Sequence, residues 1–411
     1  MKTGMVLLLC ALLAACAAAP VTQRDERFFG DRLFAPPTRR ISADDVFALS
    51  AEMRRYLDRE IAELARVKGR PRALFDALYD KGQLRLEYDT EMTRNAAEAF
   101  AARSGNCLSL VIMTAAFAKE LGLAVEYQKV YVDDAWARAG DVYLAIGHVN
   151  LTLGRRRTDE APVAHRVGGR PHETDAMTID FLPPKDLRTV RSQPIGEEIV
   201  VAMYLNNRAG EALALGQLDD AYWWAREAIV QAPGFLVPYN TLGAIYQRHG
   251  NPAEARRVLA HVLEREPGNT QAMANLVPVL AGLGQVEEAQ RLAAVLESID
   301  PEPPFSHFKR GMAALRAGDA RGARDAFARE VARAPDYHEF QFWLAVAHFD
   351  TGDVEAARRH LTLAMQNSTT RRDHDLYAAK LDRIDGWRQR APESSVSPAV
   401  ADLLPGGSAP R

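Results

Sequence analysis

Cysteine is scarce in this chain, with 3 cysteines among 411 residues. Cys10 and Cys16 lie at the N-terminus, so Cys107 is the only thiol in the rest of the sequence. This shortage excludes a disulfide framework there, and the scattered histidines beside a single cysteine do not have the spacing of a metal site. A lone free cysteine is most often a small buried apolar residue, and less often a reactive nucleophile.

An excess of charge of one sign is also missing. The chain has 51 Lys and Arg against 54 Asp and Glu, which leaves a formal net charge of -3, and the two signs are interspersed. Without a basic stripe there is no electrostatic footprint for nucleic acid, so we expect no nucleic-acid partner. After the N-terminus the sequence also lacks an apolar run long enough to cross a bilayer, which needs about 20 residues.

The N-terminus has the form of an export signal. In "MKTGMVLLLCALLAACAAAP" one lysine precedes a short apolar run, and small residues follow it. The run Leu13-Ala14-Ala15-Cys16 resembles the lipobox of bacterial lipoproteins. The resemblance implies that residues 1–15 are a signal peptide and that Cys16 becomes lipidated. An ordinary signal peptide with an accidental cysteine is the alternative.

A lipid anchor at Cys16 would place the protein in the bacterial cell envelope. The residue after Cys16 is alanine rather than aspartate, which by resemblance to sorted lipoproteins points to the outer membrane, facing the periplasm. Residues 16–41 contain charges, glycine and a Pro-Pro pair but no hydrophobic period, so we predict a tether there.

The C-terminal half repeats with a period of 34 residues. Glycine, alanine and proline each recur at this interval: Gly216, Gly250, Gly284, Gly318 and Gly352; Ala221, Ala255, Ala289, Ala323 and Ala357; Pro233, Pro267, Pro301 and Pro335. The pattern resembles tetratricopeptide repeats, which are helical hairpins that stack into a solenoid. It implies five repeats over 199–370 and a groove that takes a protein or peptide segment.

Each recurring residue has a physical reason. Glycine ends the first helix in a left-handed turn, small residues let the paired helices approach, and proline cannot continue the second helix. Pro278 falls inside a first helix and is expected to kink it. Residues 371–390 are predicted to form a capping helix, and the tail 391–411, rich in proline, serine and glycine, is predicted to be disordered.

Residues 42–195 have a different pattern, with helices first and strands later, which predicts an α+β domain. Apolar residues at helical spacing follow Ser42, a candidate helix cap, and a second helix is expected near 70–80. A third helix begins near Cys107. The expected strands cover 124–132, 141–153 and 176–182.

Two polar residues interrupt these strands. His148 lies in "AIGHVNLTL" and Asp180 in "TIDFL". A buried histidine is most often a satisfied core residue, but a buried aspartate needs a partner. If the two strands are neighbours, Asp180 can accept a hydrogen bond from His148. The Ser-Gly-Asn turn before Cys107 would place its sulfur at the positive end of a helix, where a thiolate is stabilised.

The segments "RSGNCLSL", "GHVNL" and "TIDF" together resemble a bacterial transglutaminase-like domain, which carries Cys, His and Asp in that order on a papain-like core. The resemblance implies that Cys107 is the nucleophile, His148 the base and Asp180 the orienting residue. Asn150 could assist or replace Asp180. Gln128 and Trp136 are candidates for the oxyanion-hole side chain. The alternative bases, His165 and His172, lie in a loop rich in glycine and arginine.

The predicted fold is therefore an α+β papain- or transglutaminase-like domain followed by an all-α tetratricopeptide-repeat solenoid. The predicted function is a cysteine enzyme that attacks a peptide, isopeptide or related amide bond without a cofactor. Hydrolysis is favoured over cross-linking, because water outcompetes amines unless a site binds the second substrate. The alternative is a non-catalytic scaffold lipoprotein in which the repeats bind a partner and the first domain is structural.

Overall fold

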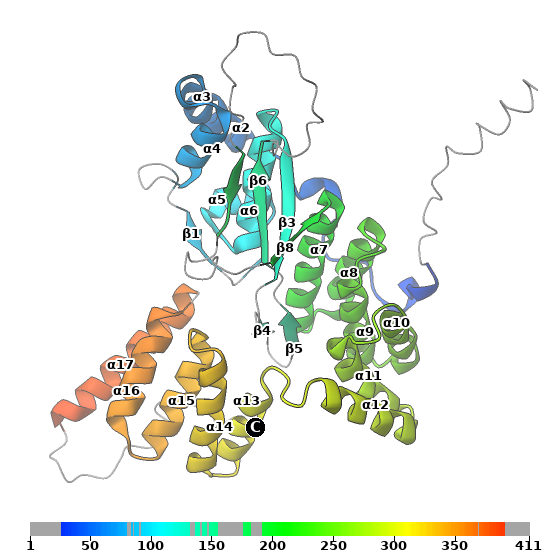
Figure 1. Ribbon diagram of the computed structural model, residues 1–411, viewed down its shortest axis with the longest axis vertical. Coiled ribbons are helices and arrows are strands. Elements are labelled where there is room, and N and C mark those ends of the chain that lie inside the picture. Colours follow the sequence, from blue (N-terminus) through cyan, green and yellow to red (C-terminus); the bar gives the residue numbers. More distant parts are fainter. Residues whose placement is uncertain are drawn as a thin grey trace, which may run out of the picture. The chain divides into compact units, whose positions relative to one another are not determined.

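The computed structural model describes residues 26–79, 84, 86–89, 92–131, 136–139, 142–145, 148–154, 176–181, 191–368 and 370–390. The predicted signal peptide, Cys16, His165, His172 and the predicted tail lie outside the described residues. The chain divides into two compact units (Figure 1). One combines residues up to Ala43 with Val201–Ala293, and the other combines Asp44–Val200 with the residues from Ala294 onward.

The second unit begins with helices. They are the 3-10 turn Ala43–Asp45 at its border, α2 Ala51–Tyr56, the π-helical turn η5 Leu57–Ile61, α3 Ala62–Lys68 and α4 Arg70–Tyr79. The predicted cap Ser42 is wrong, because α2 begins after Ser50, whose Oγ accepts a hydrogen bond from Met53 N at 3.2 Å. The carbonyl of Val46 accepts a bond from Ala96 N at 3.0 Å, which holds this stretch of backbone outside the helix.

The helix that begins at Cys107 is buried over most of its length. Helix α6 covers Cys107–Glu120, and its residues 107–118 are all buried. A helix that is apolar on all sides belongs in a core. It packs against α4, α5 (Ala96–Ala102) and the strands β3 and β6. The first residue of α6 is therefore carried by a rigid, fully surrounded helix.

The strands follow the helices along the chain. They are β1 Glu87–Tyr88, β2 Ser104–Gly105, β3 Val125–Tyr131, β4 Trp136–Ala139, β5 Val142–Ala145, β6 His148–Leu153, β7 Met177–Ile179 and β8 Arg191–Ile195. The main sheet has the order β7-β6-β3-β8 with antiparallel neighbours. Within the predicted strand 141–153, β5 and β6 belong to different sheets, and β5 pairs with β4 in a two-stranded sheet.

Strand β6 is buried along its whole length. Because successive side chains of a strand point to opposite faces, Val149 and Leu151 lie on one face and His148, Asn150 and Thr152 on the other. Three polar side chains are thus aligned on one face of a central strand. This alignment positions the candidate site.

From Glu197 onward the described residues are helical. They form the pairs α7 Glu197–Ala214 and α8 Leu218–Gln231; α9 Val237–His249 and α10 Pro252–Arg265; α11 Thr270–Gly282 and α12 Val286–Ile299; α13 Ser306–Arg316 and α14 Ala320–Arg333; α15 His338–Asp350 and α16 Val354–Gln366. The single helix α17 Arg371–Arg390 follows where a capping helix was predicted. Helix α11 continues through Pro278, so this proline does not end it.

The glycines of the 34-residue period adopt the left-handed backbone conformation predicted for them. Gly250 closes α9 with φ of 86°, in the left-handed region that side chains disfavour. Inside α9, a Cβ at Gly243 would lie 2.6 Å from Leu259 Cγ of α10. Helices α9 and α10 can therefore pack this closely only because residue 243 is glycine and has no side chain.

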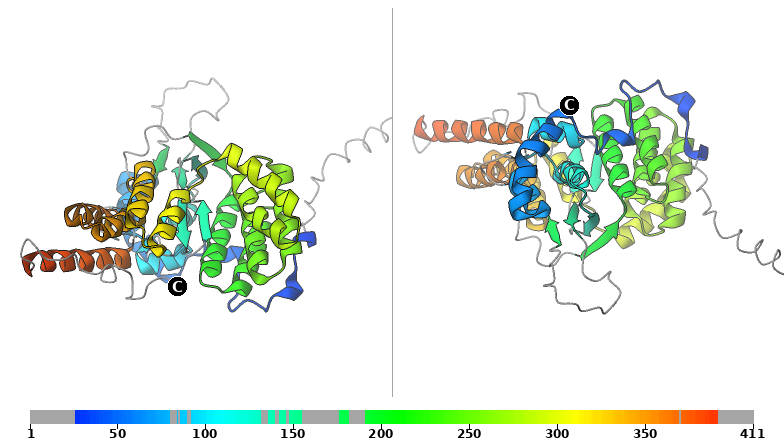
Figure 2. Two further views of the ribbon diagram at one scale, coloured as in Figure 1. Left: turned by 90° about the horizontal axis from the view of Figure 1, so that it is seen from below. Right: turned by 90° about the horizontal axis from the view of Figure 1, so that it is seen from above.

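The predicted tether is partly wrong. Residues 26–38 do not run freely but pack onto α8, α9 and α10, within the same compact unit (Figure 2). Phe28 and Phe34 are only 2% and 6% exposed. The segment has no hydrophobic period because it is neither helix nor strand over most of its length. Its aromatic rings are instead buried by residues about 200 positions away.

Candidate active site

Cys107 is the first residue of α6, directly after the helix cap. Asn106 is the cap, and its Oδ1 accepts a hydrogen bond from Ser109 N at 2.9 Å. Its Nδ2 donates to Thr93 Oγ1 at 2.9 Å, which fixes the orientation of the capping amide. Cys107 is a free cysteine, 6% exposed, at the helix end where backbone N–H groups and the helix dipole favour negative charge.

The turn before Cys107 has no room for a side chain. A Cβ at Gly105 would lie 2.6 Å from Ser109 Cβ, closer than atoms can approach. Ser109 Oγ in turn accepts a hydrogen bond from Arg94 N at 2.8 Å and donates to Asn106 Oδ1 at 2.9 Å. The motif Gly-Asn-Cys-x-Ser therefore forms a tightly packed, hydrogen-bonded turn that fixes the position of Cys107.

His148 and Asp180 form a buried pair. Nε2 of His148 lies 2.7 Å from Oδ1 of Asp180, and the two side chains are only 4% and 9% exposed. Cys107 interacts with the same imidazole, because its side chain contributes to the raised pKa of His148. The structure thus brings together the three residues of the predicted triad. They come from the start of α6, the start of β6 and the position directly after β7.

The surroundings of His148 favour its charged form. Burial lowers the pKa of the imidazole, but hydrogen bonds with Asp180 and then Cys107, together with their charges, raise the pKa to about 9. A pKa of about 9 favours the imidazolium over the neutral ring at neutral pH. An imidazolium beside a sulfur is the arrangement that stabilises a thiolate.

Asn150 assists Asp180 and does not replace it. Its Nδ2 donates to Asp180 Oδ2 at 2.8 Å, while His148 contacts the other carboxylate oxygen. The Asp180 carboxylate is therefore hydrogen-bonded on one oxygen by His148 and on the other by Asn150. Asn150 Oδ1 is buried without a hydrogen-bond partner among the described residues.

Gln128 is on β3, so it lies one strand further from Asp180 than Asn150 does. It stands opposite Asn150 in the pairing of β3 with β6, and its Nε2 donates to Thr152 Oγ1 at 3.3 Å. Its amide is therefore engaged with a neighbouring side chain of the sheet. The side chain of Trp136, the other oxyanion-hole candidate, lies outside the described residues.

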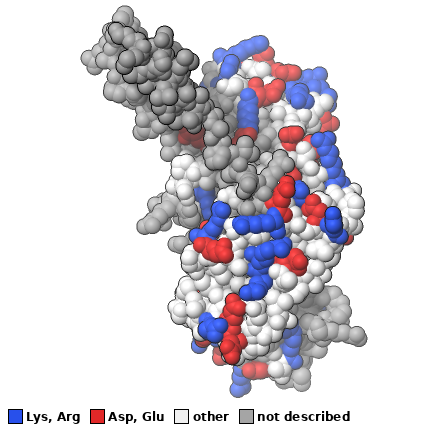
Figure 3. Space-filling view, turned by 90° about the vertical axis from the view of Figure 1, so that its right-hand side faces the viewer, with Lys and Arg blue, Asp and Glu red and all other residues white. Residues whose placement is uncertain are grey.

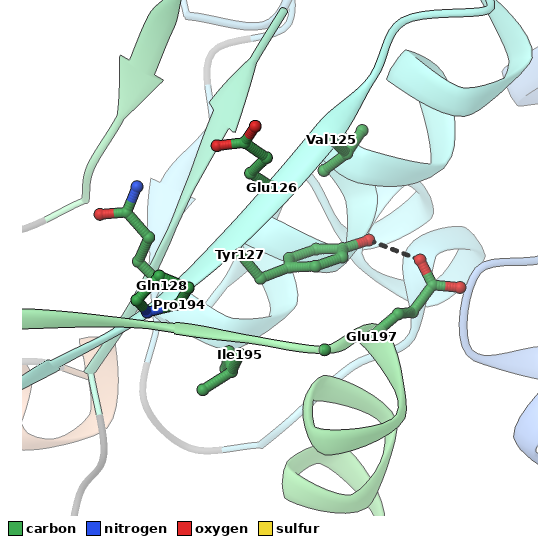
Figure 4. A pocket seen from close by; sticks show the side chains of 8 residues that line it. Val125, Glu126, Tyr127, Gln128, Pro194, Ile195 and Glu197 are labelled. Atoms are coloured by element: carbon green, nitrogen blue, oxygen red, sulfur yellow. Dashed lines mark hydrogen bonds between the residues drawn. The ribbon is translucent and has the colours of Figure 1, made fainter. Parts of the chain in front are cut away.

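A cavity of about 300 Å³ lies between β3 and β8, and Gln128 is one of its lining residues. In Figure 4, Tyr127 points away from Gln128 toward Glu197, and its hydroxyl donates to Glu197 Oε2 at 2.9 Å. Lys119 of α6 forms an ion pair with the same carboxylate. This network ties the end of α6 to the start of α7.

Other kinds of site find little support in the described part of the chain. There, no cluster of three or more His, Cys, Asp and Glu side chains has the geometry of a metal site. Nor is any helix in the described ranges both long and apolar enough to cross a bilayer. On the face drawn in Figure 3, basic and acidic side chains are intermingled.

Sequence reasoning missed the residues that hold the turn before Cys107. Thr93, Arg94 and Ser109 fix the cap through the bonds described above. Asn106 is a residue type favoured at helix caps, so the cap itself carries a local sequence signal. Thr93 and Arg94 carry no comparable signal, because they reach the turn only through tertiary folding.

Comparison with known proteins identifies the helical pairs. Residues 246–310 and residues 308–369 each match a family model described as tetratricopeptide repeat. The chain therefore carries tetratricopeptide repeats, which confirms that part of the sequence prediction.

Individual relatives match only part of this chain. Protein FlbA of Caulobacter vibrioides is 27% identical over 169 residues, which is 39% of this chain and 28% of that protein. A solved tetratricopeptide-repeat protein of Thermus thermophilus, TTC0263, is 18% identical, covers 43% of this chain and 97% of its own, and has a TM-score of 0.30. MamA of Desulfovibrio magneticus is also 18% identical, with coverage of 38% and 95% and a TM-score of 0.23.

Proposed function

We propose that residues 42–195 form a transglutaminase-like cysteine enzyme domain, and that the repeats bring a protein or peptide substrate to it. The observation that carries the proposal is the buried His148–Asp180 pair with Cys107 interacting with the same imidazole. A buried charged pair without a catalytic task is expensive to keep in a fold. Perturbed titrating groups that converge on a nucleophile are typical of active sites.

The proposed reaction is acyl transfer through a thioester. The Cys107 thiolate attacks the carbonyl carbon of an amide, and the N–H groups at the start of α6 stabilise the oxyanion. The His148 imidazolium gives its proton to the leaving amine as the C–N bond breaks. The neutral ring then takes a proton from water, which attacks the thioester and releases the carboxylic acid and the thiolate. Asp180 and Asn150 keep the ring oriented.

Hydrolysis is the favoured outcome of this chemistry. Cross-linking requires a second site that holds an amine against the thioester long enough to exclude water. The cavity beside Gln128 is lined by Glu126 and Glu197 as well as apolar and small residues. This cavity, one strand away from the triad, is a candidate for binding part of the substrate. Its lining does not indicate which amine, if any, would accept the acyl group.

The cellular setting proposed for this enzyme is the bacterial envelope. The lipobox-like run ending at Cys16 supports a lipid anchor there, with the protein at the outer membrane facing the periplasm. Mass spectrometry of the N-terminal peptide tests this. A diacylglycerol-modified Cys16 at the new N-terminus is expected, whereas an unmodified cysteine would contradict the anchor.

The alternative function is a scaffold. Tetratricopeptide repeats are interaction modules, so the repeats alone are also consistent with a non-catalytic assembly protein. In that case the first domain would be structural and Cys107 would be an inert core residue. The reactivity of Cys107 separates the two functions.

The test uses the chain from residue 16 with Cys16→Ser, in which Cys107 is the only thiol. At neutral pH, iodoacetamide should alkylate Cys107 at least about ten-fold faster than it alkylates glutathione. His148→Ala should abolish this advantage, and His374→Ala, an exposed histidine of α17, should leave it unchanged. Ultraviolet thiolate absorbance gives the charge of the sulfur independently of reagent access. A protonated Cys107 that reacts no faster than glutathione would favour the scaffold.

A further inference from the structure

The first two helical pairs bury a segment of the chain's own N-terminus. We call the surface that does this the aromatic slot, and it consists of Tyr222 of α8, Tyr239, Tyr246 and His249 of α9, and His261 of α10. Residues 28–38 lie in it. The slot and the segment belong to one compact unit.

Phe34 occupies one end of the slot. Its ring stacks on Tyr222 with centroids 4.0 Å apart and an angle of 6° between the planes. The ring of His249 lies 4.4 Å away on a tilted plane. Stacked aromatic pairs at such distances contribute beyond their buried area, so Phe34 has the properties of an anchor residue.

Phe28 occupies the other end. Its ring meets Tyr239 edge-on at 5.7 Å and His261 at 4.6 Å, and it is almost fully buried. The hydroxyl of Tyr246 donates to the Phe28 carbonyl at 2.8 Å. The slot thus contacts both the ring and the main-chain carbonyl of Phe28.

Between Phe28 and Phe34 in the chain, the carboxylate of Asp31 is bound by side chains of α8. Its Oδ1 accepts bonds from Tyr222 OH at 2.5 Å and from Arg226 Nε at 2.9 Å. Charge-assisted hydrogen bonds are stronger and more selective than neutral ones. The anchors therefore follow the pattern Phe-x-x-Asp-x-x-Phe.

Beyond Phe34, α8 holds the main chain of the segment. Asp219 Oδ1 accepts a bond from Ala35 N at 2.8 Å, and Trp223 Nε1 donates to the Ala35 carbonyl at 2.7 Å. Asp220 accepts bonds from Thr38 N at 2.7 Å and Thr38 Oγ1 at 2.6 Å. Side chains that satisfy the backbone of an extended segment are typical of peptide recognition.

We propose that the aromatic slot is a binding site for protein segments with the pattern Phe-x-x-Asp-x-x-Phe, and that residues 28–38 fill it in cis until such a partner displaces them. This deepens the recruiting role proposed for the repeats and rests on it. The backbone hydrogen bonds of α8, α9 and α10 are made within each helix, so the segment can leave without breaking them. Covalent linkage gives the segment a high effective concentration, so a partner binds well only after the segment is released.

The experiment compares the chain from residue 16 (Cys16→Ser) with its Phe28→Ala/Phe34→Ala variant, using a fluorescently labelled peptide of residues 26–40 as the probe. The variant should bind the peptide at least about ten-fold more tightly than the parent chain, because its own segment no longer competes. Peptides with Phe34→Ala or Asp31→Ala should lose that binding. A peptide with Arg32→Ala, an exposed residue, should keep it.

Two results would overturn the proposal. In one, the variant keeps its helical circular dichroism but binds the peptide no better than the parent. In the other, the variant loses helical signal, which would make the segment a structural part of the repeats rather than an exchangeable ligand. Because Cys107 alkylation does not involve the slot, failure here is distinguishable from failure of the proposed enzyme.

Discussion

Nε2 of His148 lies 2.7 Å from Oδ1 of Asp180, although 32 positions separate the two residues in the chain. The antiparallel pairing of β6 with β7, in which Leu151 stands opposite Ile179, brings the two side chains together. Asn150 joins them from the same face of β6. The relationship is thus a consequence of strand register, and a slip of one residue would turn His148 to the opposite face.

Asp180→Asn should lower the pKa of His148 from about 9 toward its ordinary value of 6.5, because the amide removes the negative charge and a charge-assisted hydrogen bond. Titration of the imidazole by NMR measures this directly. Alkylation of Cys107 at neutral pH should fall by about ten-fold or more. Thr178→Ser on the same strand is the matched control and should change neither. An unchanged histidine titration would show that Asp180 does not control the imidazole.

Gly105→Ala should destabilise the domain by about 1–3 kcal/mol, because the added Cβ would overlap Ser109. Urea unfolding measures the loss. The matched control is Gly268→Ala, where a Cβ meets nothing within 4 Å, and its effect should stay within about 0.5 kcal/mol. If the two variants unfold alike, the turn before Cys107 tolerates more movement than the structure indicates.

Gly311→Ala should destabilise the C-terminal repeats by about 1–3 kcal/mol, since a Cβ there would lie 2.5 Å from the ring of Phe327. Gly282→Ala, also inside a repeat helix but in open space, is its control and should be close to neutral or slightly stabilising. Thermal unfolding followed by circular dichroism compares them. Equal melting temperatures would argue against close packing of α13 on α14.

The C-terminal repeats should lose stability in acid. The rings of His348 and His360 stack with centroids 5.3 Å apart, and burial lowers the pKa of both below 6.5. Asp353 opposes this shift for both rings, whereas Arg359 adds to it. The unfolded chain therefore binds more protons than the fold once the pH drops below about 6.5, and stability falls as the pH decreases.

Melting temperature measured across this pH range tests the histidine pair. His348→Phe keeps a stacked ring without a titrating group and should reduce the pH dependence, to which His360 still contributes. His374→Ala removes an exposed histidine of α17 and should leave the pH dependence unchanged. A parent curve that is already flat would contradict the assignment.

The helical periods were readable from residue spacing alone. The 34-residue recurrence of glycine, alanine and proline reports local requirements, namely a left-handed turn, a close helix contact and a helix stop, and each acts within one repeat. The start of α6 at Cys107 was also readable, because a helix cap is a local signal. The cap at Ser50 was missed, and Ser42 was predicted in its place, because a backbone bond from Ala96, distant in sequence, keeps Val46 out of the helix.

Chain order and composition were enough to nominate Cys107, His148 and Asp180, since an aspartate in a buried strand demands a partner wherever it is. Their convergence, and the supporting position of Asn150, depended on strand register, which long-range pairing sets. The docking of Phe28 and Phe34 was invisible in the linear chain for the same reason. Their partners lie about 200 residues away, and only the folded repeats bring those rings together.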